Sequence, residues 1–297
     1  MNYREMPVYA ERNRIVESLE HNQVVVVESP TGSGKTTQLP VILHEAGYTK
    51  NGMVGVTQPR RIAAVSVSDF IRNQIQPEVP EFVAYKMRFE DHTTPATHLK
   101  IMTDGTLLQE LKNDTSLRQY SVIVIDEAHE RSLTIDFILG LLKRVREERP
   151  DFRIIISSAT INAEVFSEYF NQCPIIRIET PAYPVQVVYD PPPTEQGYDG
   201  IIFRISEVVE RILDNDQKGD ILIFASGEKF IKDIIQQLQN MPYRRRLHIL
   251  PLYGRLSKEE QDRVFPPAPK GKIKVVVSTN IAETSVTIDG ITSVIDT

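Results

Sequence analysis

The chain has 297 residues, of which 41% are hydrophobic and 25% are charged, and its formal net charge is −6. These values are typical of a globular protein, and no apolar run approaches the roughly 18 residues that a membrane span needs. The acidic balance gives no support for nucleic-acid binding through overall charge, so such binding requires a local basic surface.

The cysteine content and the N-terminal segment indicate the compartment. Cys173 is the single cysteine, which excludes an internal disulfide and a cysteine-based zinc cluster and favours a reducing environment. The first residues, MNYREMPVYAERN, lack the apolar core of a signal peptide. We therefore expect an intracellular protein, cytoplasmic or nuclear, with no membrane partner.

In the first part of the chain, apolar β-branched runs alternate with helix-length segments such as 36–47 and 134–148. Strands that alternate with helices predict an α/β fold with a mainly parallel sheet and helices on both faces. The runs predicted to form strands are residues 23–29, 53–58, 98–103, 122–126 and 153–158.

The composition changes at residue 181, where a segment rich in Pro, Tyr and Gly predicts a linker and an entry strand. Alternation then resumes, which predicts two α/β domains, 1–180 and 181–297. A helix follows the linker, with one apolar stripe formed by Ile201, Ile205, Val208, Ile212 and Leu213. Later strands are predicted at 220–225, 247–253, 272–279 and 291–296.

A glycine-rich loop, ESPTGSGKTTQ, follows the first predicted strand and begins a helix. Gly32 and Gly34 permit backbone conformations in which successive N–H groups face phosphate oxygens. Lys35 can reach the β- and γ-phosphates of a nucleotide, and the Thr36 hydroxyl can coordinate Mg²⁺. Ser29 stands where the usual pattern has its first glycine, so the match is incomplete, but the loop is predicted to bind phosphate.

The strand predicted at 122–126 runs directly into two adjacent acids, Asp126 and Glu127. Burying an unpaired carboxylate is costly, so these acids need a reason to lie there. Parallel strands bring their carboxyl ends to one edge of the sheet, which is where ligands bind. At that edge Asp126 can hold Mg²⁺, and Glu127 can orient or deprotonate an attacking water.

Further segments accompany the loop and the two acids in a fixed order along the whole chain. With TGSGKTT, these segments resemble the DEAH-box helicases of superfamily 2. The resemblance implies two RecA-like domains with Mg²⁺ and ATP between them, single-stranded RNA across them, and remodelling of RNA or RNA–protein complexes. The segments are TQPRRIAA (57–64), RFED (88–91), MTDGTLL (102–108), DEAH (126–129), SSAT (157–160), PLYGRLSKEEQ (251–261), FPPAPKG (265–271) and STNIAETSVTIDG (278–290).

The resemblance assigns roles at the phosphate end of the nucleotide. Asp126 would be the metal ligand, together with Thr36, and Glu127 would be the catalytic base. His129, also counted with the catalytic residues, would work with Ser158 and Thr160 to couple ATP to RNA. On its residues alone, a surface histidine at a helix start is the favoured interpretation of His129. The predicted phosphate-binding residues are Gly32, Ser33, Gly34, Lys35, Thr36 and Thr37.

The resemblance also assigns contacts to the rest of the nucleotide. Asp289 matches a nucleotide-facing acid of the second domain, and Phe265 matches an aromatic residue that stacks on the base. A core phenylalanine at a helix end is an equally good interpretation of Phe265. Phe70 stands where the family commonly has an arginine that stacks on the base from the first domain, which puts the base preference in doubt.

Five positions match residues that contact the RNA backbone in the family. Contacts of this kind respond to charge and geometry, so little base specificity is implied. For the two arginines, a solvated surface charge is the alternative interpretation. The residues are Arg61, Arg88 and Thr103 in the first domain and Thr279 and Asn280 in the second.

The chain stops at SVIDT, before any segment similar to the QRxGRxGR motif of the family. We therefore expect a truncated form of a longer ATP-dependent RNA helicase, with an incomplete second domain and weak or no activity by itself. An activating protein partner is also expected from the family. Two other functions stay open, namely a DNA-directed translocase of superfamily 2 and a nucleotide-binding module that recruits a partner without unwinding.

Overall fold

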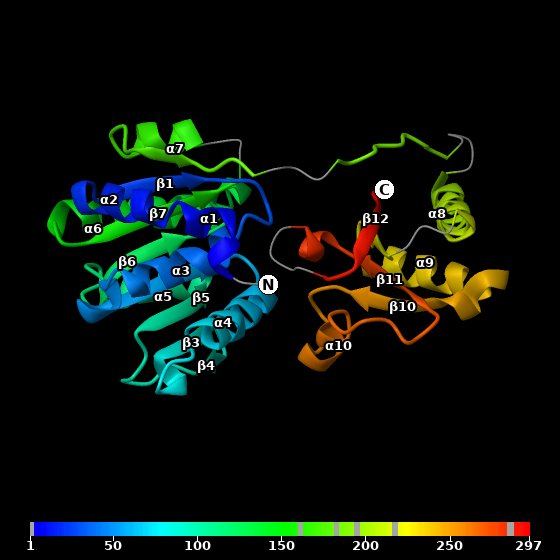
Figure 1. Cartoon of the computed structure of the whole chain (residues 1–297), viewed down its shortest axis with the longest axis horizontal. Helices are drawn as coiled ribbons and strands as arrows, with labels where there is room; N and C mark the ends of the chain where they lie inside the picture. Colours follow the sequence, from blue (N-terminus) through cyan, green and yellow to red (C-terminus); the bar gives the residue numbers. More distant parts are fainter. Residues whose placement is uncertain (1–2, 160–162, 181–183, 193–196, 216–218, 284–287) are drawn as a thin grey trace. The chain divides into compact units, whose positions relative to one another are not determined.

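The computed structural model describes residues 3–159, 163–180, 184–192, 197–215, 219–283 and 288–297. The chain divides into two compact units, Met1–Tyr183 and Pro184–Thr297, which are shown in Figure 1. Each unit is a sheet flanked by helices, so the expected α/β class is confirmed. None of the described helices is both long and apolar enough to cross a membrane.

The first unit is built on an eight-stranded sheet in the order β4-β3-β5-β2-β6-β7-β1-β8. All of its pairs are parallel except β3 with β4. The strands are β1 (Val24–Glu28), β2 (Met53–Gln58), β3 (Val83–Met87), β4 (Glu90–Asp91), β5 (Leu99–Thr103), β6 (Tyr120–Ile125), β7 (Arg153–Ser158) and β8 (Ile175–Arg177).

Helices cover both faces of this sheet, so its central strands are buried on both sides. In β1, Val25 and Val27 pack into one apolar cluster, whereas Val24 and Val26 pack into the other. Strand side chains alternate between faces, which explains why these positions form an unbroken valine run.

The first cluster includes residues of four helices, α1 (Pro7–Ala10), α2 (Arg12–His21), α3 (Lys35–Glu45) and α4 (Arg61–Ile75). The second includes residues of α5 (Asp104–Asn113), α6 (Leu133–Glu148) and α7 (Ala163–Tyr169). Short 3-10 turns lie at Tyr3–Glu5, Tyr48–Lys50, Pro80–Phe82 and Ala128–Glu130.

The second unit has a four-stranded parallel sheet in the order β10-β11-β9-β12. One apolar cluster joins this sheet to two helices. The described elements of the second unit are α8 (Gly197–Asp214), β9 (Asp220–Phe224), α9 (Glu228–Asn240), β10 (Leu247–Leu252), α10 (Lys258–Asp262), β11 (Ile273–Ser278) and β12 (Ile291–Ile295), with 3-10 turns at Pro242–Arg246 and Asn280–Ala282.

Two sequence-based details of the second unit are wrong. Val209, not Val208, is fully buried, because Val209 and Leu213 follow Ile205 at four-residue intervals and so share one helix face. The entry strand expected after residue 181 is not formed by the described residues 184–192, which have no strand neighbour. Apolar side chains of this segment, such as Val187, are exposed instead.

Candidate nucleotide site

The predicted phosphate loop connects β1 to α3 and depends on glycine at two positions. Gly32 and Gly34 have φ angles of 81° and 92°, in the region that side chains disfavour. A Cβ atom at residue 34 would also lie 2.7 Å from the sulfur of Met6. The loop therefore leads into the amino end of α3, where free N–H groups and the helix dipole favour an anion.

Lys35 is the first residue of α3, and its side chain is buried. Its Nζ donates to the carbonyl oxygens of Ser29 and of Pro30, the latter at 3.1 Å, so the loop folds around its own ammonium group. Burial lowers the pKa of Lys35, and the negative charges of Asp126 and Glu127 oppose that change. The ammonium and the two acids therefore interact within one site.

The carboxylate of Asp126, at the carboxyl end of β6, is fully buried and accepts three side-chain hydrogen bonds. Thr36 Oγ1 and Gln58 Nε2 both donate to Oδ2 at 2.6 Å, and Ser157 Oγ donates to Oδ1 at 2.6 Å. These donors come from α3, β2 and β7, so three neighbouring elements fix the orientation of one acid.

Glu127 follows in a left-handed backbone conformation, with a φ angle of 52°, that non-glycine residues seldom adopt. Burial, followed by the neighbouring charge of Asp126, raises the pKa of Glu127 to about 8, whereas Lys35 acts in the opposite direction. A carboxylate with a raised pKa is a stronger proton acceptor when ionised. Its environment therefore suits a general base.

His129 joins the DEAH segment to the end of β7. Its Nε2 lies 3.3 Å from Glu127 Oε2, and its Nδ1 accepts a 3.2 Å hydrogen bond from the backbone N–H of Ala159. The hydroxyl of Ser158, which is buried, donates to the carbonyl oxygen of Ala159 at 3.1 Å. Thr160, the other predicted coupling residue, lies outside the described residues.

The donor set around this edge fits phosphate and magnesium. Within the described ranges, the hydroxyls of Ser29 and Ser33 and the amide oxygen of Gln58 are buried without a hydrogen-bond partner. Thr36 and Asp126 offer the oxygen ligands that Mg²⁺ prefers. The described residues contain no group of three or more His, Cys, Asp or Glu that could hold a metal by themselves, but Mg²⁺ bound with phosphates and water needs only one or two.

The predicted RNA contacts of the first unit lie close to the carboxyl ends of its strands. Arg61 begins α4 just after β2 and pairs with Glu90 at 2.9 Å, with both side chains partly exposed. Arg88 lies in the turn between β3 and β4, its guanidinium 5.0 Å from the centre of the Phe89 ring. The Thr103 hydroxyl at the end of β5 lies 2.9 Å from that of Thr106.

The predicted nucleotide contacts of the second unit are held together by a residue that sequence reasoning missed. Lys274 is fully buried in β11. Its Nζ donates to the carbonyl oxygens of Val264 (2.9 Å) and Pro266 (3.2 Å), on either side of Phe265, and of Asp289 (3.4 Å). The Phe265 side chain is half-buried, and Asp289 is exposed.

The remaining predicted residues are placed as follows. Thr37, in the first turn of α3, has its hydroxyl 3.4 Å from the carbonyl oxygen of Gly34. Thr279 directly follows β11 and is half-buried, while Asn280 beside it is exposed. Phe70 lies on α4 with 42% of its surface exposed, which leaves its ring accessible.

Two polar residues that sequence reasoning missed, Gln58 and Ser157, contact Asp126 directly. Gln58 belongs to the TQPRR motif and is the last residue of β2, and Ser157 belongs to the SSAT motif and is the next-to-last residue of β7. Both strands are neighbours of β6 in the sheet. That position at the sheet edge was the available signal, because neighbouring parallel strands bring their ends together.

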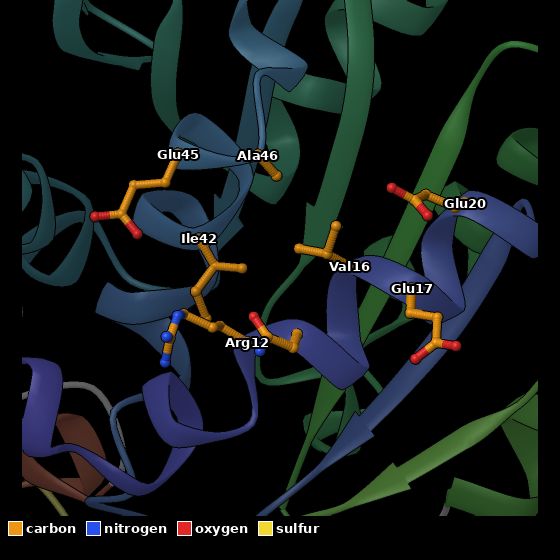
Figure 2. A pocket seen from close by; sticks show the side chains of 8 residues that line it. Arg12, Val16, Glu17, Glu20, Ile42, Glu45 and Ala46 are labelled. Atoms are coloured by element: carbon orange, nitrogen blue, oxygen red, sulfur yellow. The ribbon is translucent and has the colours of Figure 1, made fainter.

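A separate pocket of about 460 Å³ lies between α2 and α3 (Figure 2). Arg12 lies in its wall, but Glu17, Glu20 and Glu45 also line it, so its net charge repels phosphate. Glu45 ends α3, whereas Lys35 begins that helix. The pocket is therefore not the predicted phosphate site.

Comparison with known protein families assigns both units. Residues 10–168 match the DEAD/DEAH box helicase family, and residues 204–297 match the helicase conserved C-terminal domain. The chain belongs to the DEAD/DEAH box helicases. The first of these matches contains the phosphate loop and the DEAH segment.

Curated relatives cover the chain almost completely. It is 54% identical over 296 residues to the ATP-dependent RNA helicase HrpA of Borreliella burgdorferi, covering 100% of this chain and 36% of that protein. It is 46% identical to HrpA of Escherichia coli and to a HrpA homolog of Haemophilus influenzae, covering 98% of this chain and 22% of each relative. The chain thus spans about a third or less of the length of these helicases.

Proposed function

We propose that this chain is the nucleotide-hydrolysing core of an ATP-dependent RNA helicase, which uses Mg²⁺ and ATP to move on single-stranded RNA and to remodel RNA or RNA–protein complexes. The observation that carries the proposal is the hydrogen bond from Thr36, in the phosphate loop, to Asp126, in the DEAH segment. The names of the HrpA relatives support the RNA part. The two domains are proposed as 1–180 and 181–297, each RecA-like.

Each residue of the site has a proposed task. The loop N–H groups of Gly32 to Thr37 and the Lys35 ammonium bind the negative phosphates, while Thr36 and Asp126 hold the metal. Bound Mg²⁺ would neutralise phosphate charge and polarise the reacting phosphoryl group. Glu127 takes the proton of the attacking water, and His129 holds Glu127 against the end of β7.

Contacts outside the phosphate site are proposed from the same family. Phe70, Phe265 and Asp289 would contact the base and sugar of the nucleotide. The five RNA-contact positions named above would bind the phosphodiester backbone, through Arg61 and Arg88 and through the hydroxyl and amide groups of the others. Because both ATP and RNA are available inside the cell, we also propose an intracellular location.

The decisive experiment is a titration of the chain with a fluorescent ADP analogue in the presence of Mg²⁺. Lys35→Ala removes the cation that faces the phosphates, and we expect binding to fall by at least about 100-fold, because buried charge-assisted hydrogen bonds are lost. Lys50→Ala, which removes an exposed lysine of the same unit, is the control and should bind as the wild type does. Equal affinity of wild type and a folded Lys35→Ala variant would refute the phosphate site.

The RNA part is tested by competition. Labelled oligouridylate bound to the chain should be displaced by unlabelled RNA at lower concentration than by DNA of the same sequence and length. Preference for DNA would favour a DNA-directed translocase instead.

A further inference from the structure

Gln58, the last residue of β2, contacts the proposed metal ligand directly. Its side chain is fully buried, and its Nε2 donates to Asp126 Oδ2 at 2.6 Å. The same carboxylate oxygen accepts from Thr36 at 2.6 Å. One oxygen atom therefore depends on two donors, of which Thr36 belongs to the phosphate loop and Gln58 belongs to β2.

The segment that begins at Gln58 has a second contact with the DEAH segment. Arg60 NH2 lies 3.1 Å from Glu130 Oε1, and both side chains are mostly buried. Residues 58–60 are therefore joined to residues 126–130 at two points, one at each end. A displacement of residues 58–60 has to move the Asp126 carboxylate or break a buried charge-assisted hydrogen bond.

The next residue along the chain faces outward. Arg61 begins α4, and its side chain is 64% exposed although it pairs with Glu90. An exposed guanidinium at a helix start can exchange this carboxylate for a phosphate group. Both are anionic acceptors that match the planar array of guanidinium N–H donors. The exposed Arg61 is thus connected through residues 58–60 to the buried Asp126 carboxylate of the proposed metal site.

We propose that Gln58 is a positioning residue that couples RNA bound at Arg61 to the orientation of Asp126. Phosphate binding at Arg61 displaces the short segment that connects β2 to α4. Gln58 transmits that displacement to Asp126 Oδ2 through its amide hydrogen bond. The inference rests on the proposed function, because it requires both a nucleotide site at Asp126 and RNA contact at Arg61.

A purely structural role for Gln58 would predict something different. An amide that only satisfies a buried carboxylate would change the free energy of unfolding when removed, but it would not change how RNA affects nucleotide affinity. Coupling between two ligands is a free energy of its own and is reciprocal, so it is measured independently of stability.

The experiment measures the affinity for a fluorescent ADP analogue in Mg²⁺, with and without saturating oligouridylate. Gln58→Met keeps the volume of the side chain but removes the donor, and Gln58→Asn keeps an amide that is one methylene too short. In both variants we expect the ratio of the two dissociation constants, which differs from one in the wild type, to approach one. Affinity without RNA should fall by about tenfold through loss of one charge-assisted hydrogen bond.

The matched control is Gln23→Met. Gln23 precedes β1 and so lies at the amino ends of the strands, opposite the nucleotide site. Its Nε2 donates to the carbonyl oxygens of Arg146 and Arg149 at 3.1 and 2.9 Å. This variant also loses amide hydrogen bonds, which are partly buried, yet its ratio of dissociation constants should equal that of the wild type. Thermal unfolding of all variants identifies any that do not fold.

The outcomes separate the two proposals. A wild-type chain that does not bind the ADP analogue refutes the proposed function itself. If the wild type binds the analogue but RNA leaves its affinity unchanged, or if the folded Gln58 variants retain the wild-type ratio, the coupling role of Gln58 is wrong while the nucleotide site stands.

Discussion

The hydroxyl of Thr36 lies 2.6 Å from Oδ2 of Asp126, although 90 residues separate the two along the chain. The contact exists because β1 and β6 are parallel strands on either side of β7, so the loop after one meets the acid after the other. A hydroxyl and a carboxylate held at this distance offer two oxygen ligands to one small cation.

Removal of this hydroxyl should therefore affect the metal-dependent part of nucleotide binding. Thr36→Val preserves the side-chain shape but eliminates one proposed ligand. We expect the gain in ADP affinity on adding Mg²⁺ to shrink by about tenfold or more, as for the loss of a hydrogen bond to a charged group. Calorimetry with Mg²⁺ or with EDTA provides the measurement.

A second threonine serves as the control for that experiment. Thr49 is buried, and its hydroxyl lies 3.0 Å from His44 Nδ1, away from the phosphate loop. Thr49→Val should leave the effect of Mg²⁺ unchanged. An identical response of the two variants would contradict the assignment of Thr36 as a ligand.

Glu127→Gln is predicted to separate binding from hydrolysis. The amide retains the size of the side chain but cannot accept a proton from water, so hydrolysis should fall by a factor of about 10²–10⁴. ADP affinity should stay within a few-fold of the wild type, because Lys35 and the loop are intact. Single-turnover hydrolysis of radiolabelled ATP measures this effect, and a wild-type rate in the variant would remove Glu127 from the role of base.

Asp104, the first residue of α5, is predicted to make stability depend on pH. Burial, followed by the charges of Glu130 and Asp126, raises the pKa of this carboxyl from 3.8 to about 6. The folded state therefore keeps its proton longer than the unfolded state does, and stability falls as pH rises from about 4 to about 6. The Asp104→Asn side chain does not ionise and so avoids this loss, and the variant should gain about 2–3 kcal/mol of stability relative to wild type between pH 4 and pH 7.

Asp114 provides the opposite case for the same measurement. The backbone N–H of Arg118 lowers the pKa of the Asp114 carboxyl, so its contribution to stability is present above its unfolded pKa and is lost as pH falls. Asp114→Asn should therefore lose stability relative to wild type at neutral pH and regain parity in acid. Urea unfolding at several pH values tests both variants, and parallel pH profiles would show that burial of Asp104 has no such effect.

Lys274 is predicted to be essential for the local structure of the second unit. Its buried Nζ binds three carbonyl oxygens and lies 3.6 Å from Asp220 Oδ2. Lys274→Met leaves these acceptors without their cation, and we expect a loss of about 3–5 kcal/mol, typical of breaking a buried ion pair. Lys270→Met, an exposed change, should have no measurable effect on thermal unfolding. Equal melting temperatures of the two variants would contradict this prediction.

The sequence alone determined the class of fold and identified the motif segments that lie within the two family matches. Unbroken valine runs such as Val24 to Val27 indicate a strand covered on both faces, and glycines before Lys35 indicate a tight loop into a helix. These signals are local, because strand periodicity and backbone freedom depend on neighbouring residues. For the same reason, the local pattern wrongly predicted a strand in the described residues 184–192, since a strand also requires a partner to which it can hydrogen-bond.

Tertiary structure alone decided which groups surround the acids. Nothing in the local pattern of TQPRR or SSAT shows that Gln58 and Ser157 donate to Asp126, because strand order decides which ends are neighbours. The raised pKa of Glu127 likewise arises from burial and from the charge of Asp126 beside it. In the sequence, Lys274 is an ordinary lysine of a predicted strand. Only the fold shows that its Nζ donates to the carbonyl oxygens on either side of Phe265 and to that of Asp289. Hydrogen bonding and desolvation act through space, so only the folded chain defines them.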